Sequence, residues 1–218
     1  MQQQQQQWLF SPADILVAFP DGGRPDKHAR MLRHVMQELH MDDDVVVAAT
    51  AHLLYYRVRM RDVGLYTSDT EHLTLVAAVL LLAGKLEERA RGQYTMAQLC
   101  DATHLTARAI ADAEYRILSV LRFDLEVSTV YHDVRRVATA EFVLRLATAV
   151  LTDAVRHTLA CLLFTSEQLA AAALLVAHVD AGVDVPPALA QHVAAADQTT
   201  LASAVAYLRA MYASALRA

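Results

Sequence analysis

Residues 73–88 decide the fold, and they read LTLVAAVLLLAGKLEE. The first eleven of them, 73–83, carry no charge and only one weakly polar side chain. This run is too short to cross a bilayer, which needs about 20 residues, so it predicts a helix buried on all sides at the centre of a soluble core. Lys85, Glu87 and Glu88 follow at once. The buried helix would therefore bring a compact charge cluster to one fixed place on the surface.

The composition favours an all-α protein. Of the 218 residues, 55% are hydrophobic and 20% are charged, which allows one large core or two small ones. Glycine and proline are scarce, at 6 and 5 residues. No long alternation of β-branched residues occurs, and helix-forming alanine and leucine are abundant.

Charge and cysteine content argue against several classes of site. The formal net charge of −5 disfavours a nucleic-acid clamp, which usually needs a basic excess. Cys100 and Cys161 provide no disulfide framework and suit a reducing compartment. His157 and Cys161 lie four residues apart, but a structural zinc site needs four ligands. Neither a metal nor a cofactor is expected.

The N-terminal residues contain neither a signal peptide pattern nor a membrane span. Residues 2–7 are all glutamine, which predicts a polar tail without chemistry. Ser11 and Pro12 are typical of the first residues of a helix, so a short N-terminal helix is predicted from about residue 12. The sequence PDGGRP at residues 20–25 predicts a linker after it.

Helix start signals then divide residues 27–121 into five predicted helices. An amphipathic helix covers 27–40, and three aspartates at 42–44 open a second one that continues through residue 60. The buried helix and two later ones begin at recognisable caps. The predicted caps are Ser68 with Glu71, Thr95 with Gln98, and Thr106, whose helix reaches about Leu121.

The second half repeats this plan. Helices are predicted near 129–147, 152–163, 166–178, 187–195 and 199–215. Thr165 with Gln168 forms another capping box before another apolar run, 169–177. Thr165 follows Ser68 by 97 residues, and this offset superposes the two apolar helices. The pattern predicts two tandem five-helix units, each built on a central buried helix.

The same offset shows that the two halves share the apolar helix but not the lysine at its end. Lys85 maps onto Gly182 and Glu87 onto Asp184. If the lysine were needed to fold the unit, both copies should carry a cation there. Its presence in one copy favours a partner-binding role over the alternative, a cation that merely suits the negative end of a helix dipole.

Two motifs resemble the cyclin family. VAAVLLLAGKLEE at 76–88 resembles the central cyclin-box helix, and AEYRILSVLRFDLEV at 113–127 resembles the fifth helix and its exit. HARMLRHVMQELHM at 28–41 and the Tyr55-Tyr56-Arg57 segment are similar to the first and second helices. The motifs look closer to the transcription-type cyclins, the T, K, L and C types, than to the mitotic ones.

The resemblance implies a function. Cyclins are not enzymes; they bind a cyclin-dependent kinase, press on its regulatory C-helix and so seat its Lys–Glu ion pair and free its activation loop. By residue matching, Lys85 would bond kinase backbone carbonyls, and Glu114 would complete the polar contact. The matching residues for the surrounding apolar surface are Leu86, Leu118, Phe123 and Leu125.

The resemblance also implies an organisation. Residues 1–24 would form the glutamine-rich tail and short helix, 25–127 an N-terminal cyclin box, and 128–218 a C-terminal cyclin-like repeat. The expected partner is one kinase in a 1:1 heterodimer, in the nucleus or also in the cytoplasm, without direct contact to nucleic acid or membrane.

The first helix departs from the mitotic pattern. Mitotic cyclins begin their substrate-docking patch with an apolar-Arg-Ala-apolar-Leu sequence and a tryptophan. Here residues 28–32 are His-Ala-Arg-Met-Leu, and Trp8, the one tryptophan, lies far upstream. Tyr56 stands where those proteins place an aspartate, so a salt bridge of Arg30 is not expected.

Simpler interpretations accompany the charged residues. Adjacent helical residues do not face each other. We therefore expect Glu87 and Glu88 to lie on a solvated surface and not to form a catalytic carboxylate pair. Arg57, Arg59 and Arg61 favour a solvated helix end, with a phosphate or activation-loop contact as the alternative. The rival functions are a cell-cycle cyclin, a TFIIB-like core that grips DNA, and an adaptor that binds no kinase.

Overall fold

The computed structural model describes residues 8–19, 27–41, 44–62, 64, 66, 68–87, 95–126, 131, 134, 140–195 and 197–215. These residues contain α-helices and no β-strand, which confirms the all-α prediction. The chain forms two compact units, one of residues 12–127 and one of residues 1–11 with 128–218. The predicted linker at 20–25 and the glutamine tract lie outside the described residues.

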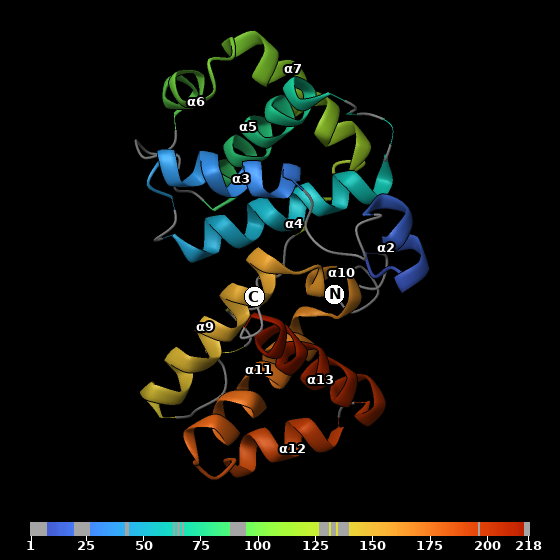
Figure 1. Ribbon diagram of the computed structural model, residues 1–218, viewed down its shortest axis with the longest axis vertical. Coiled ribbons are helices and arrows are strands. Elements are labelled where there is room, and N and C mark those ends of the chain that lie inside the picture. Colours follow the sequence, from blue (N-terminus) through green and yellow to red (C-terminus); the bar gives the residue numbers. More distant parts are fainter. Residues whose placement is uncertain are drawn as a thin grey trace. The chain divides into compact units, whose positions relative to one another are not determined.

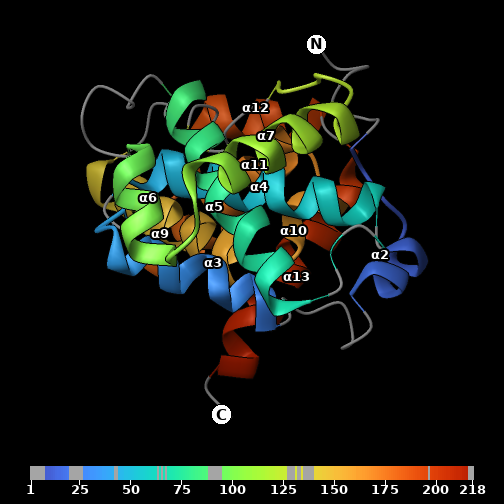
Figure 2. The same cartoon turned by 90° about the horizontal axis from the view of Figure 1, so that it is seen from above.

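The unit 12–127 is built around one helix, α5. Its helices are α2 (Pro12–Ala18), α3 (Lys27–Glu38), α4 (Val45–Arg61), α5 (Asp69–Leu86), α6 (Met96–Thr103) and α7 (Ala107–Val120). α5 packs against α3, α4, α6 and α7, and the two perpendicular views show it enclosed by them (Figures 1 and 2). All residues from 75 to 84 are buried, as the uncharged run predicts. Burial of one leucine contributes about 1.5–3 kcal/mol, so the buried leucines of α5 contribute strongly to the stability of this unit.

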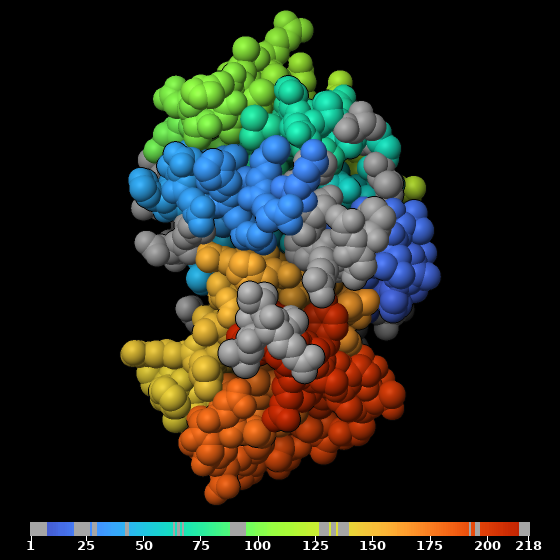
Figure 3. Space-filling view, in the orientation of Figure 1, coloured from blue at the N-terminus to red at the C-terminus, as the bar shows by residue number. Residues whose placement is uncertain are grey.

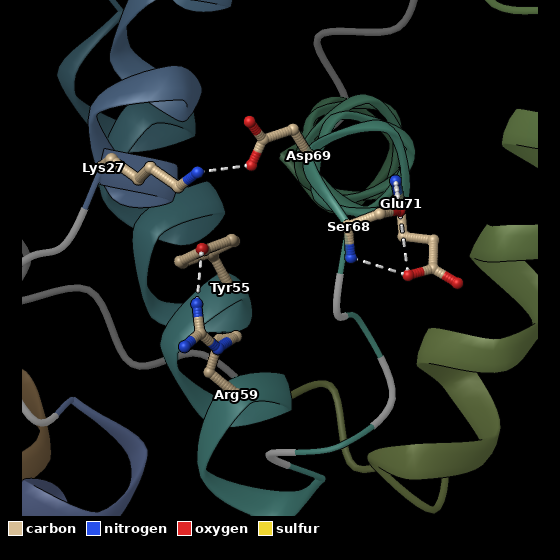
Figure 4. Close-up of polar contacts among 6 residues, drawn as sticks. All are labelled: Lys27, Tyr55, Arg59, Ser68, Asp69 and Glu71. Carbon is tan, nitrogen blue, oxygen red and sulfur yellow. Dashed lines mark hydrogen bonds and ion pairs between the residues drawn. The ribbon is translucent and has the colours of Figure 1, made fainter.

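The start of α5 is fixed by polar contacts (Figure 4). The Ser68 hydroxyl accepts a hydrogen bond from the Glu71 amide at 3.2 Å, and Glu71 accepts one from the Ser68 amide at 2.9 Å. This is the predicted capping box, which satisfies two amides that the first turn leaves without helical partners. Lys27 forms a 2.7 Å ion pair with Asp69 and so joins α3 to the first residue of α5.

Two arginines of α4 are buried, so the prediction of a solvated helix end is wrong for them. Arg57 is 5% exposed and Arg59 is 8% exposed; Arg61 is exposed, as predicted. Arg59 donates to the Tyr55 hydroxyl at 3.1 Å (Figure 4) and to the Ala18 carbonyl at 3.2 Å, and its guanidinium lies 5.2 Å from the Phe19 ring centre. These contacts hold the end of α2 against α4.

The second unit has the same design around α11. Its helices are α9 (Glu141–His157), α10 (Ala160–Leu163), α11 (Ser166–Ala181), α12 (Pro187–Ala195) and α13 (Gln198–Ala215). α11 packs against α9, α10, α12 and α13, and α12 and α13 form the orange to red surface in Figure 3. The predicted capping box of Thr165 and Gln168 is present. The Phe10 amide donates to the Leu162 carbonyl at 2.9 Å, which attaches the N-terminal segment to this unit.

The helix boundaries near residue 150 differ from the prediction. The sequence predicts helices over 129–147 and 152–163, but α9 continues through 148–151 and ends at His157. Val143, Ala147, Leu151 and Ala154 form an unbroken buried stripe. Thr152 does not start a helix, because its hydroxyl donates to the Thr148 carbonyl one turn back. Residues 135–139 lie outside the described residues.

Tyr66 carries an unusual buried hydroxyl. The residue is 5% exposed, and its hydroxyl has no hydrogen-bond partner among the described residues. It lines a cleft of about 270 Å³ between α5 and α7, where Arg116 and Asp112 also lie. Burial raises the pKa of Tyr66 to about 12, although the Arg116 charge opposes the shift. The folded chain therefore keeps this phenol protonated at pH values where an unfolded chain ionises it.

We expect Tyr66→Phe to raise the free energy of unfolding at pH 7 by about 1 kcal/mol, because it removes a buried hydroxyl that has no hydrogen-bond partner in the described part of the chain. Above pH 10 the unfolded wild-type chain loses a proton that the folded chain retains until about pH 12, so wild-type stability falls across this range. The variant should lose less stability there, as measured by urea unfolding at pH 7, 10 and 11. Tyr55→Phe is the control: it removes the acceptor of Arg59 and should destabilise. A destabilised Tyr66→Phe would contradict the assignment.

Candidate functional site

The last turn of α5 meets the middle of α7 in an ion pair. The Lys85 ammonium donates to both carboxylate oxygens of Glu114, at 2.6 and 2.8 Å. Lys85 lies in the last helical turn, where the negative end of the helix dipole favours a cation. Glu114 is presented by α7, which packs along α5 on its buried residues Ile110, Ala113 and Ile117. The structure thus brings together the two polar residues that the sequence singles out.

The two members of this pair differ in exposure. The Lys85 side chain is 48% exposed, whereas that of Glu114 is only 16% exposed. Two of the three ammonium hydrogens are used on Glu114. The third has no acceptor among the described residues and is available for an external carbonyl or carboxylate. The recessed Glu114 acts as a support that holds this donor in a defined position.

The opposite side of the α5 end is held by another contact. The Thr50 hydroxyl of α4 donates to Glu87 Oε1 at 2.7 Å. Glu87 is the C-cap of α5, and its amide donates to the Ala83 carbonyl at 3.1 Å. The prediction that Glu87 belongs to a solvated surface is therefore wrong, because the side chain is half-buried against α4. Glu88 lies outside the described residues.

The end of α7 displays Phe123 through a specific backbone turn. The Phe123 amide donates to the Leu118 carbonyl at 2.8 Å, and the Arg122 amide donates to the Ser119 carbonyl at 3.0 Å. This is a Schellman motif, which brings Phe123 and Leu118 to the same helix end. Arg122 and Phe123 have φ angles of +53° and +57°, a left-handed conformation that costs non-glycine residues roughly 1–2 kcal/mol each. Phe123 is nevertheless 64% exposed.

The segment after Phe123 is tied back to α4. Arg57 donates from Nη1 to the Glu126 carbonyl at 2.9 Å, which explains why this arginine is buried. Leu125 lies between these points and is half-buried. Of the six predicted residues, Lys85 and Glu114 are in direct contact, and Leu118 follows Glu114 by one helical turn. Leu86, next to Lys85 in the chain, and Phe123, just after the end of α7, are both exposed.

Tyr115 is a surface residue that the sequence analysis did not select. It is 68% exposed on α7, one turn before Leu118, with which it shares a helix face. Leu86, Tyr115 and Phe123 are three of the eight large hydrophobic residues that are exposed in the described part of the chain. The spacing of three from Leu118 was the available signal, but a tyrosine on an amphipathic helix has no distinctive pattern of its own.

Other kinds of site find little support in the described residues. No group of three or more histidine, cysteine, aspartate or glutamate side chains there is placed to hold a metal ion. His157 ends α9 and Cys161 belongs to α10, so a break in the chain direction separates them. None of the described helices combines the length and the apolar character that a membrane span requires.

Comparison with known proteins identifies the fold. No family model matches the sequence, and no curated protein matches it. Solved structures do match. A viral cyclin from herpesvirus saimiri is 14% identical with a TM-score of 0.65, over 85% of this chain and 84% of that chain.

Two structures of kinase complexes contain similar chains. One is the yeast RNA polymerase II CTD kinase complex CTDK-1, at 16% identity and a TM-score of 0.67, over 94% of this chain and 72% of that chain. The other is the yeast TFIIK complex (Kin28/Ccl1/Tfb3), at 14% identity and a TM-score of 0.60, over 94% and 95%. The all-α architecture predicted from the composition and the cyclin fold implied by the sequence motifs are thus both confirmed.

Proposed function

We propose that this protein is a cyclin, a regulatory subunit without catalytic activity of its own that binds a cyclin-dependent kinase as a 1:1 heterodimer and activates it. The observation that carries the proposal is the Lys85–Glu114 pair at the surface of a cyclin fold. Within the described residues the half-exposed ammonium retains one unused donor, and the exposed side chains of Leu86, Tyr115 and Phe123 lie on the same two chain segments.

The geometry supports a positioning mechanism. Lys85 would donate to backbone carbonyl oxygens beside the kinase C-helix, while Glu114 keeps the ammonium oriented. A donor that is already held in place loses less conformational freedom on binding. The apolar residues around the pair would exclude water and strengthen the polar contact. Fixing the C-helix in this way seats the kinase Lys–Glu ion pair, on which its activity depends.

The kind of kinase is also part of the proposal. The motifs LAGKLEE and FDLEV resemble transcription-type cyclins, and two similar structures are described as an RNA polymerase II CTD kinase complex and as TFIIK. These similarities support a transcription-associated kinase and a nuclear site of action. The net charge of −5 supports a protein partner rather than direct binding of nucleic acid.

Lys85→Ala and Glu114→Ala should each weaken kinase binding by at least about 30-fold, because a bound kinase would cover the pair, and removing one member of a covered charged contact costs about 2–5 kcal/mol. The kinase is first identified by affinity purification from cells that make this chain, with Lys85→Glu as the comparison. The two purified subunits are then recombined. Binding and phosphorylation of an RNA polymerase II CTD repeat peptide are measured.

Lys27→Ala is the matched control for these variants. Lys27 also forms an ion pair between two helices, at 2.7 Å, but its side chain and that of Asp69 are 61% and 66% exposed. This change should leave kinase binding and activation within twofold of wild type. Normal activation by both site variants would contradict the proposal. A salt-sensitive mobility shift of duplex DNA would instead favour a TFIIB-like function.

Phe123→Ala should weaken kinase binding by about 30-fold, and Tyr115→Ala should weaken it measurably, because exposed aromatic side chains often dominate interface energies. Neither change should lower the melting temperature by more than about 2 °C, since both side chains are mostly in solvent. Phe142→Ala is the control. It removes the same side chain at 66% exposure from α9 in the other unit. If Phe123→Ala and Phe142→Ala both bound the kinase with wild-type affinity, Phe123 would be excluded from the interface.

A further inference from the structure

Glu87 occupies a position that is electrostatically unfavourable. It is the C-cap of α5, and a carboxylate at this end of a helix is repelled by the negative end of the dipole. A glutamate here needs a compensating donor. The Thr50 hydroxyl provides it, at 2.7 Å from Glu87 Oε1. Hydrogen bonds with one charged partner contribute about twice as much as neutral ones.

The Thr50 hydroxyl differs from those of several other threonines in helices. The hydroxyls of Thr74, Thr103, Thr148 and Thr152 donate to the carbonyl one turn back in their own helix. Thr50 is fully buried in α4, yet it donates to a residue 37 positions away, on another helix. A buried hydroxyl that leaves its own helix for a carboxylate makes a specific contact between helices.

The α5 end is therefore held on two sides. Residues two apart on a helix point in nearly opposite directions, since each residue turns by about 100°. Lys85 reaches Glu114 of α7, and Glu87 reaches Thr50 of α4. The Thr50 contact fixes the final turn, in which the Glu87 amide donates to the Ala83 and Lys85 carbonyls.

We infer that Thr50 is a positioning residue for the proposed kinase-binding site: through Glu87 it holds the last turn of α5, and so keeps the Lys85 ammonium where a partner can use it. This inference rests on the proposed function. A bound kinase would accept from the third hydrogen of the Lys85 ammonium, while the other two stay on Glu114. The Thr50–Glu87 bond then restrains the end of α5 independently. Without it, the terminal turn frays and Lys85 samples more orientations, which reduces affinity.

The test compares four variants of the full chain. Thr50→Val keeps the shape and removes the donor, whereas Thr50→Ser keeps a hydroxyl and should rescue. Glu87→Ala removes the half-buried partner of Thr50 without altering the core. It also removes the carboxylate that the helix dipole repels, so it should weaken kinase affinity less than Thr50→Val does. Thr103→Val removes a buried threonine hydroxyl that serves only its own helix, and it controls for the general effect of losing such a hydroxyl.

Two measurements test the inference: the opening of the last turn of α5 and the affinity for the kinase. Amide hydrogen exchange of the free chain should become about tenfold faster at Glu87 in Thr50→Val, because the terminal turn opens more often. Affinity for the kinase recovered with the wild-type chain should fall about tenfold, which corresponds to about 1.4 kcal/mol. Thr50→Ser should stay within threefold of wild type in both measurements, and Thr103→Val should match wild type in both.

A double-mutant cycle separates positioning from general stability. In the Lys85→Ala background, Thr50→Val should reduce affinity by less than twofold, because the side chain that it positions is absent. A full tenfold loss of affinity in that background would overturn the inference. The inference would also be overturned if Thr50→Val bound the kinase with wild-type affinity while Lys85→Ala bound it weakly. Wild-type affinity of Lys85→Ala would instead overturn the proposed function itself.

Discussion

Burial of α5 on all sides is the constraint on which the rest of this structure depends. A helix enclosed by α3, α4, α6 and α7 has no exposed face between residues 75 and 84. Only its ends can carry polar chemistry, and each end is fixed by polar side chains. At the start these are the helix's own capping box and Lys27 of α3, which pairs with Asp69. At the end they are Glu114 of α7 and Thr50 of α4. The position of Lys85 at the surface thus follows from the packing of α5 and from the contacts at the end of that helix.

The surface beside Lys85 departs from the most stable arrangement in two ways. Arg122 and Phe123 adopt left-handed φ angles without being glycine, and large apolar side chains are left in solvent. Local strain and exposed apolar area are both tolerated at functional sites, where the surrounding fold determines the geometry. Here the local geometry is held by the Schellman hydrogen bonds at the end of α7 and by the hydrogen bond from Arg57 to the Glu126 carbonyl. The coincidence of strain, exposure and a half-exposed ion pair on adjoining segments is what distinguishes this surface.

The parts of the fold that depend on residues close together in the sequence could be predicted from it. All three capping boxes and the central position of α5 follow from local pattern, and the resemblance at Lys85 and Glu114 selects two residues that meet in space. The misses are of another kind. The burial of Arg57 and Arg59 depends on carbonyl groups 69 and 41 residues away, and the Glu87 contact depends on a threonine 37 residues away. Periodicity carries no information about such partners. The error at α9 was local, because a threonine that bonds its own helix has the same sequence pattern as one that begins a helix.

Comparison of α5 with α11 explains how one scaffold can carry different surfaces. Both helices begin at a capping box, and their first residues are related by the 97-residue offset. They differ at the other end. α11 stops at Gly182, whose φ of +63° forms a left-handed cap, at the position that corresponds to Lys85. A glycine in this conformation ends the helix without steric cost, whereas α5 continues to Leu86. The turn that presents Lys85 and Glu87 therefore extends α5 beyond the point at which α11 ends, while the buried parts of the two helices follow the same pattern.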